Sequence, residues 1–79
     1  MSHETYQPVA CSQYDLYEIA IMRARPVELV WYDDDGVVQQ ARLKPVGLET
    51  RAGEEFLLLQ HLQQAGLLAV RLDRIRGMK

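Results

Sequence analysis

The chain has 79 residues and a net charge of −2, and 48% of its residues are hydrophobic. This length predicts one domain with a small core, and no stretch approaches the roughly 18 apolar residues that a membrane span needs. The negative charge argues against non-specific nucleic-acid binding, and the first residues lack the basic and apolar regions of a secretory leader. The lone cysteine, Cys11, has no disulfide partner within the chain, so we expect a cytoplasmic protein.

The first predicted element is a helix over residues 12–25, which follows an extended arm over residues 1–11. Ser12 is the expected N-cap, Asp15 completes a capping pattern, and Pro26 is expected to end the helix. At about 100° per residue, one arc of this helix is predicted to pack and the opposite arc to face outward. The packing arc holds Leu16, Tyr17, Ala20, Ile21 and Ala24, and the outward arc holds Tyr14, Asp15, Glu18, Met22 and Arg25.

The acidic residues of the outward arc have two readings. Asp15 and Glu18 lie near the N-terminus of the predicted helix, where negative charge stabilises the helix dipole. They are therefore either helix-stabilising residues on a solvated face or part of a surface that binds a partner.

Residues 27–32 alternate in the manner of a strand with one buried face. The Asp-Gly step that ends the run Asp33–Gly36 predicts a hairpin turn, and a second strand over residues 37–44 is expected to end at Pro45. The three adjacent aspartates lack the ligand spacing of a calcium loop. We expect a solvated turn or a contact with a basic partner there, and no metal site.

Residues 54–62 are ambiguous, because their Leu, Glu and Gln content favours a helix. Gly53 and Gly66 limit the segment to a length that a strand can fill, and residues 67–72 have the pattern of a partner strand. We therefore predict a strand over residues 54–62 and a hairpin turn over residues 63–66. A bend at Asp73 and Arg74 is expected to precede a last strand.

Catalytic and metal-binding signatures are absent from the sequence. It contains no Gly-rich phosphate loop, nucleophile elbow, H-E-x-x-H motif or C-x-x-C motif. His3 lies near the N-terminus, His61 falls on a predicted strand, and Cys11 has no general base nearby in sequence. We predict no catalytic residue, no metal site and no cofactor.

Two motifs resemble the bacterial Rho-binding antiterminator family, also called Rof. The first comprises Tyr6-Gln7-Pro8-Val9, Cys11, Tyr14-Asp15 and Glu18, and the second, Arg71-Leu72-Asp73-Arg74-Ile75, is similar to the family's R-L-D-K-I stretch. The resemblance implies an Sm-like small five-stranded antiparallel barrel over residues 27–79. The expected fold is therefore mainly β with one N-terminal α-helix, in a single domain over residues 1–79.

The resemblance also implies a function. Members of this family bind transcription termination factor Rho and inhibit Rho-dependent termination by blocking the primary RNA-binding surface of its N-terminal domain. We therefore expect a monomer without enzymatic activity that binds Rho and does not bind nucleic acid directly. The implied partner-binding residues are Tyr14, Asp15, Glu18 and Arg51.

The chain departs from the family at four positions beside these residues. Relatives can carry two aspartates at Ser12 and Gln13, and they can carry lysine and asparagine at Ala52 and Gly53. A surface with fewer charges should bind more weakly, although its binding should stay sensitive to salt.

Two other readings stay open. An Sm-like RNA-binding module would use the basic residues near the C-terminus and show a steep salt dependence. A small structural or oligomerisation domain would place Trp31, Tyr32 or the run Leu57–Leu59 at an interface. The basic residues of the RNA-binding reading are Arg71, Arg74, Arg76 and Lys79.

Overall fold

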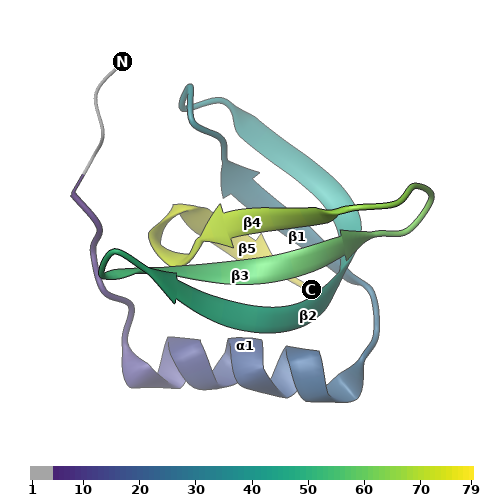
Figure 1. Ribbon diagram of the computed structural model, residues 1–79, viewed down its shortest axis with the longest axis horizontal. Helices are drawn as coiled ribbons and strands as arrows, with labels where there is room; N and C mark the ends of the chain where they lie inside the picture. Colours follow the sequence, from purple (N-terminus) through teal and green to yellow (C-terminus); the bar gives the residue numbers. More distant parts are fainter. Residues whose placement is uncertain (1–4) are drawn as a thin grey trace.

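A computed structural model describes residues 5–79 of the chain as one helix followed by a five-stranded antiparallel sheet (Figure 1). The expected fold, mainly β with one N-terminal helix, is confirmed. Residues 5–10 form the extended arm that leads into the helix. The elements are α1 (Cys11–Arg23), β1 (Val27–Tyr32), β2 (Val38–Arg51), β3 (Glu54–His61), β4 (Leu67–Arg71), the 3-10 helix η1 (Leu72–Arg74) and β5 (Ile75–Met78).

The strands are hydrogen-bonded in the order β4-β3-β2-β1-β5, so that β2 lies at the centre. The sheet is strongly bent: β3 and β4 lie in front of β1 and β5 in Figure 1, and β2 runs from one layer to the other. β4 and β5 are the two ends of this strand order, and η1 joins them. The predicted bend at Asp73 and Arg74 is therefore confirmed, and it brings β5 alongside β1.

The prediction that the second strand ends at Pro45 is wrong. β2 continues to Arg51, and Pro45 is fully buried opposite Leu59 of β3. The register between β2 and β3 shifts between Pro45 and Gly47, which marks a β-bulge. A bulge tolerates a residue without an N–H group and bends the strand locally. One long strand can therefore pair with β1 through its first half and with β3 through its second half.

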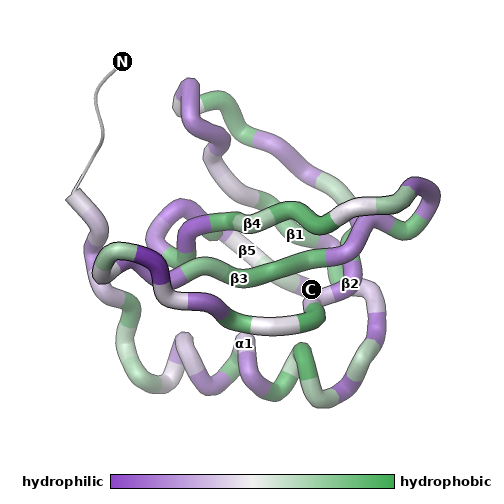
Figure 2. The backbone as a smooth tube through the Cα atoms, viewed as in Figure 1, coloured by the Kyte–Doolittle hydropathy of each residue, from purple (hydrophilic) through white to green (hydrophobic). Residues whose placement is uncertain are grey.

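The core lies inside the bend of the sheet. The strand predicted over residues 54–62 is confirmed as β3, in which Leu57 and Leu59 are completely buried. Figure 2 shows β3 and β4 as a largely hydrophobic centre, whereas α1 alternates between hydrophobic and hydrophilic segments. The reading that places the Leu57–Leu59 run at an interface is wrong, because the inward leucines of this run are core residues. The core cluster consists of Tyr17, Leu29, Leu43, Leu57, Leu59, Val70 and Leu72.

The helix packs mainly against β2. It ends at Arg23 and not at residue 25 as predicted, because Ala24 adopts a left-handed conformation with a φ of 54°. The Ala24 N–H donates a hydrogen bond to the Ile21 carbonyl, which closes the last turn at a distance of 3.1 Å. The chain therefore leaves the helix before Pro26 and turns directly into β1.

Candidate partner-binding surface

The start of α1 differs from the predicted capping pattern. Ala10 and not Ser12 occupies the N-cap, and no side chain caps the helix. The carbonyl of Ala10 accepts hydrogen bonds from the N–H groups of Gln13 and Tyr14, both at 3.0 Å. Ser12 therefore lies inside the first turn. The predicted capping role of Ser12 and Asp15 is wrong, and the Asp15 carboxylate is left for other contacts.

The packed face of α1 is centred on Tyr17 and Ala20, which are both buried. Tyr14 precedes Tyr17 by one turn, so it shares this face and lies half-buried against the core cluster. Leu16 was expected to pack but is 51% exposed. The predicted positions of Tyr14 and Leu16 are therefore wrong, because the packed face is rotated by part of a turn from the predicted arc.

Asp15 and Glu18 are both exposed, as the predicted outward arc requires. They are three residues apart and therefore neighbours on the helix surface. Within residues 5–79, neither carboxylate forms an ion pair or a side-chain hydrogen bond. Asp15 directly follows Tyr14 and Glu18 lies about one turn after it, so α1 presents two adjacent carboxylates beside a half-buried aromatic ring.

Arg51 lies at the end of β2, before the tight turn at Ala52 and Gly53, which both have positive φ values. Its side chain is 53% exposed and forms two hydrogen bonds with Glu49, at 2.8 and 2.9 Å. The guanidinium also lies over the ring of Phe56, 5.3 Å from its centroid. The hydrogen bonds to Glu49 raise the pKa of Arg51 and lower the pKa of Glu49.

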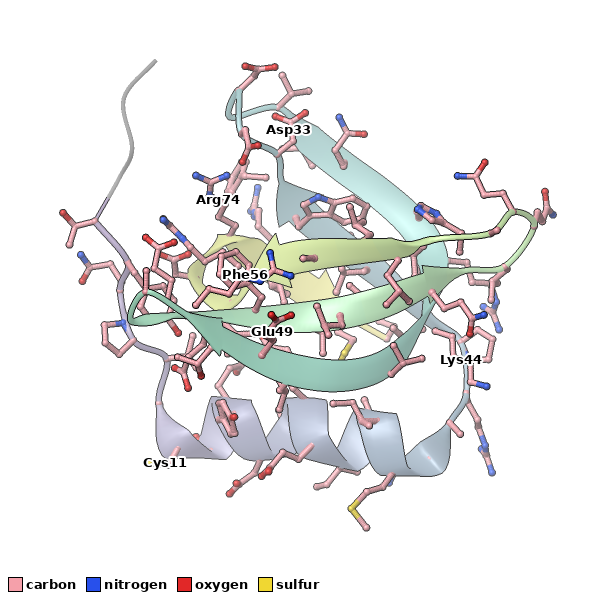
Figure 3. The ribbon with its side chains drawn as sticks, in the orientation of Figure 1. Cys11, Asp33, Lys44, Glu49, Phe56 and Arg74 are labelled. Carbon is pink, nitrogen blue, oxygen red and sulfur yellow. The ribbon has the colours of Figure 1, made fainter. Side chains whose placement is uncertain are left out.

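Figure 3 shows Glu49 and Phe56 side by side on β2 and β3, where they are direct partners in the sheet register. The guanidinium of Arg51 is therefore held between a carboxylate and an aromatic ring. Because Glu49 offsets the charge of Arg51, the pair would attract a basic partner only weakly. The exposed side of the guanidinium can instead contact a carboxylate or an aromatic ring.

The N-terminal arm connects the turn between β2 and β3 to the start of α1. The Tyr6 hydroxyl donates a hydrogen bond to Glu55 at 2.9 Å, and the Gln7 N–H donates to Asp73 at 2.9 Å. Partial burial and the Glu55 contact raise the pKa of Tyr6. Figure 1 shows the turn between β2 and β3 and the start of α1 at the same end of the molecule, and Arg51 immediately precedes this turn. In the part of the chain that the structure describes, no hydrogen bond or ion pair joins Arg51 directly to the three helix residues.

Most of the basic residues that an RNA-binding module would use contact other side chains of the protein itself. Arg71 is only 6% exposed and pairs with Asp73 at 2.6 Å and with Glu54 at 3.3 Å. Arg74 pairs with Asp34, and Arg76 lies over the Tyr32 ring. The sequence analysis did not predict this network, because the burial that Arg71 and Asp73 share comes from β4 and η1.

The aspartates of the hairpin between β1 and β2 have separate roles. The Asp33 carboxylate accepts hydrogen bonds from the N–H groups of Asp35 and Val37 and from the Gln39 side chain, all at 2.9 Å. The contacts with Gln39 and then Val37 lower the pKa of Asp33. Asp34 pairs with Arg74, and Figure 3 shows Asp33 above Arg74 at the top of the fold. The predicted turn is confirmed, and Asp33 is a structural residue within it.

The remaining candidate residues form no site. No group of three or more His, Cys, Asp or Glu residues suited to a metal ion occurs within residues 5–79. Cys11 is exposed at the first position of α1, and His61 is half-buried at the end of β3. His3 lies outside the described residues. None of the helices in the described chain is long and apolar enough to cross a membrane.

No family model matches the chain, and no curated protein matches it. Among solved structures, the chain is similar to proteasome accessory factor B/C (PafBC) of Arthrobacter aurescens, with a TM-score of 0.73 and 22% sequence identity. The match covers 92% of this chain but only 12% of PafBC. At this identity the likeness shows the fold alone. The chain thus has the fold of a small helix-plus-sheet domain that also occurs as a minor part of a larger protein.

Proposed function

We propose that this protein binds transcription termination factor Rho and inhibits Rho-dependent termination by covering the primary RNA-binding surface of its N-terminal domain. The observation that carries the proposal is the pair of exposed, unpaired carboxylates, Asp15 and Glu18, on one face of α1. The resemblance of this segment to the Rho-binding antiterminator family supplies the identity of the partner. The proposal implies a cytoplasmic, non-enzymatic regulator that acts as a monomer.

The chemistry of single-stranded RNA recognition supports this assignment. Protein surfaces that bind single-stranded RNA combine basic groups for the phosphates with aromatic platforms for the bases. Asp15 and Glu18 would take the place of two phosphates on such a surface. The exposed part of the Tyr14 ring would cover an aromatic platform beside them, while its buried part anchors the ring to the core. The protein would therefore compete with RNA by presenting similar groups on a rigid helix.

Arg51 adds a second contact region at the same end of the molecule. Its ion pair with Glu49 and its contact with the Phe56 ring restrict the guanidinium before any partner binds. A restricted side chain loses less conformational entropy on binding. We therefore assign Arg51 to contacts with a carboxylate or an aromatic ring at the edge of the Rho surface.

The RNA-binding alternative has less support from the arrangement of charges. Burial and ion pairing engage Arg71, and Asp34 pairs with Arg74. Arg76 and Lys79 are the remaining exposed cations of that set, and Arg76 lies over the Tyr32 ring. Two exposed cations form too small a patch for strong phosphate binding.

A competition titration tests the proposal. A labelled pyrimidine-rich oligonucleotide is bound to purified Rho, and the protein is added at increasing concentration while fluorescence anisotropy is recorded. We expect displacement of the oligonucleotide, with an affinity that falls as salt is raised, because the contact depends on charge. An unchanged anisotropy at saturating protein, together with no direct binding to Rho by calorimetry, would contradict the proposed function.

A further inference from the structure

A second surface of the molecule lies along α1 and does not include Asp15 or Glu18. The helix, the segment that follows it and the end of β5 enclose a groove of about 390 Å³. The apolar residues that line it are Leu16, Ile19, Ala20, Pro26, Val27 and Met78.

The apolar residues on the helix side of this groove are unusually exposed. Leu16 is 51% exposed and Ile19 is 42% exposed. They are three residues apart and both line the groove, so they are neighbours on the surface of α1. Contiguous exposed apolar residues on a small domain mark an interaction site more often than scattered ones do.

The rim of the groove is positively charged. Arg23, Arg25 and Lys79 line it, and all three are exposed. None of them forms an ion pair within residues 5–79, whereas Arg51, Arg71 and Arg74 each pair with a carboxylate. The main chain of Lys79 is fixed by two hydrogen bonds with Glu28 of β1, at 2.9 and 3.0 Å. The protein therefore carries basic residues beside an apolar groove lining, although its net charge is −2.

We propose that this groove binds an acidic amphipathic segment of a protein partner. Charge complementarity selects the occupant, because carboxylates on the segment would pair with Arg23, Arg25 and Lys79 while its apolar side chains enter the groove. Helices are recognised in this way through apolar residues at positions i, i+3, i+4 and i+7. The apolar residues line a hollow, which suits a ridge of side chains better than the flat surface of a bilayer.

This surface is distinct from the one proposed to bind Rho. Asp15 and Glu18 carry negative charge and do not line the groove, so they favour a basic partner, whereas the groove favours an acidic one. The protein would thus be able to hold two oppositely charged partners through two sides of one helix.

The test uses two synthetic amphipathic helices that share the same leucine spacing. One carries glutamates at the flanking positions and the other carries lysines at the same positions. We expect the glutamate peptide to bind in a fluorescence anisotropy titration and the lysine peptide not to bind. The double variant Arg23→Glu with Arg25→Glu should weaken binding of the glutamate peptide about tenfold, since two rim ion pairs are lost.

A matched control variant, Arg42→Glu with Lys44→Glu, makes the same change in net charge on β2, outside the groove. It should bind the glutamate peptide as the unmodified protein does.

A second variant, Leu16→Ser with Ile19→Ser, should remove binding without changing the rim. Circular dichroism and the urea midpoint verify that each variant is folded. Displacement of RNA from Rho by the Arg23 and Arg25 variant should be unchanged, which separates this inference from the proposed function.

Four results would overturn the inference. The first is no binding of the glutamate peptide at about 1 mM, the weak end of specific association. The second is equal binding of the two peptides. The third is binding to phosphatidylglycerol vesicles but not to the glutamate peptide. If the Arg23 and Arg25 variant lost this vesicle binding, the groove would be assigned to a membrane. The fourth is a dimer in sedimentation that the same variant dissociates, which would assign the groove to a second copy.

Discussion

Asp15 and Glu18 are the residues on which the proposed Rho contact depends. Both are exposed and neither has an ion-pair partner within residues 5–79, so replacing them should not disturb the fold. We expect Asp15→Arg combined with Glu18→Arg to abolish displacement of RNA from Rho, because the contact becomes repulsive. The anisotropy titration described above measures the loss.

The control for this variant is Glu28→Arg combined with Asp35→Arg. Both residues are exposed and lie on the hairpin of β1 and β2, and the change in net charge is the same. It should retain the displacement of RNA. Full activity of a folded Asp15 and Glu18 double variant would remove the acidic helix face from the mechanism.

Arg71 is a residue on which folding depends. Its guanidinium is 6% exposed and contacts Asp73, Glu54 and the ring of Tyr6. We expect Arg71→Met to lower the free energy of unfolding by about 3–5 kcal/mol, because it leaves a poorly exposed Asp73 carboxylate without its buried partner. Urea denaturation measures this change.

The comparison for Arg71 is Arg76→Ala, in which an exposed guanidinium over the Tyr32 ring is removed. That substitution should cost about 0.5–1 kcal/mol. Equal effects of the two substitutions would show that the buried network of Arg71 does not stabilise the fold.

The hairpin of β1 and β2 depends on one ionised side chain. The hydrogen bonds to Gln39 and Val37 hold the pKa of Asp33 below its ordinary value of 3.8. The pKa of Asp33 is lower in the folded protein than in the unfolded chain, so its ionised carboxylate stabilises the fold fully at pH values above 3.8. This stabilisation is lost as the pH falls through the pKa of the folded state. We expect NMR titration of the Asp33 carboxyl carbon to show this lowered pKa.

Hydrogen exchange gives a second test of the same turn. The N–H groups of Asp35 and Val37 donate to Asp33, so Asp33→Ala should increase their exchange rates, while the Asp35→Ala control should leave the exchange of Val37 nearly unchanged. Equal protection of Val37 in both variants would show that Asp33 does not hold the turn.

The attachment of α1 to the sheet depends on Tyr17. Its ring is completely buried in the core, and its hydroxyl accepts a hydrogen bond from the Gln13 amide at 3.0 Å. Burial raises the pKa of Tyr17. We expect Tyr17→Ala to cost about 3–5 kcal/mol of unfolding free energy and Tyr17→Phe about 0.5–1.5 kcal/mol, as measured by urea denaturation.

Met22 provides the control on the same helix. It is 82% exposed, so Met22→Ala should change the free energy of unfolding by less than about 0.5 kcal/mol. A Tyr17→Ala variant as stable as the Met22→Ala variant would mean that the helix is not held by its packed face.

At the scale of the whole molecule, the charges of the two halves of the chain meet. The sequence places acidic residues in the first half and basic residues near the C-terminus. Pairing of β5 with β1 brings Arg74 to Asp34 and Arg76 to Tyr32, and η1 places Asp73 beside Arg71. Carboxylates therefore neutralise Arg71 and Arg74 within the protein, whereas Arg76 and Lys79 stay exposed.

This neutralisation leads to a prediction about nucleic acid. We expect the isolated protein not to bind a pyrimidine-rich RNA at physiological salt with a dissociation constant below about 100 μM, the weak limit of non-specific binding. Anisotropy of a labelled RNA, recorded at low and at physiological salt without Rho, measures it. Micromolar binding with a steep salt slope would instead favour the RNA-binding module.

Local patterns in the sequence predicted much of the fold. The strand over residues 54–62 was predicted from the glycines that flank it and from the partner strand that follows, although its leucine content favours a helix. The Asp-Gly step predicted the hairpin after Asp33, and helix geometry predicted the exposure of Asp15 and Glu18. Each of these features is decided by residues close together in the chain.

Only the tertiary structure decided which face of α1 packs, where β2 ends and which charges are available to a partner. The helix has apolar residues around most of its circumference, so the surface of β2 selects the face of Tyr14 and Tyr17 and leaves Leu16 exposed. Pro45 is tolerated because a bulge opposite β3 accommodates it. Arg71 reaches Glu54 because β4 pairs with β3, and this contact between residues 17 apart depends on the relative positions of whole strands, which no local pattern encodes.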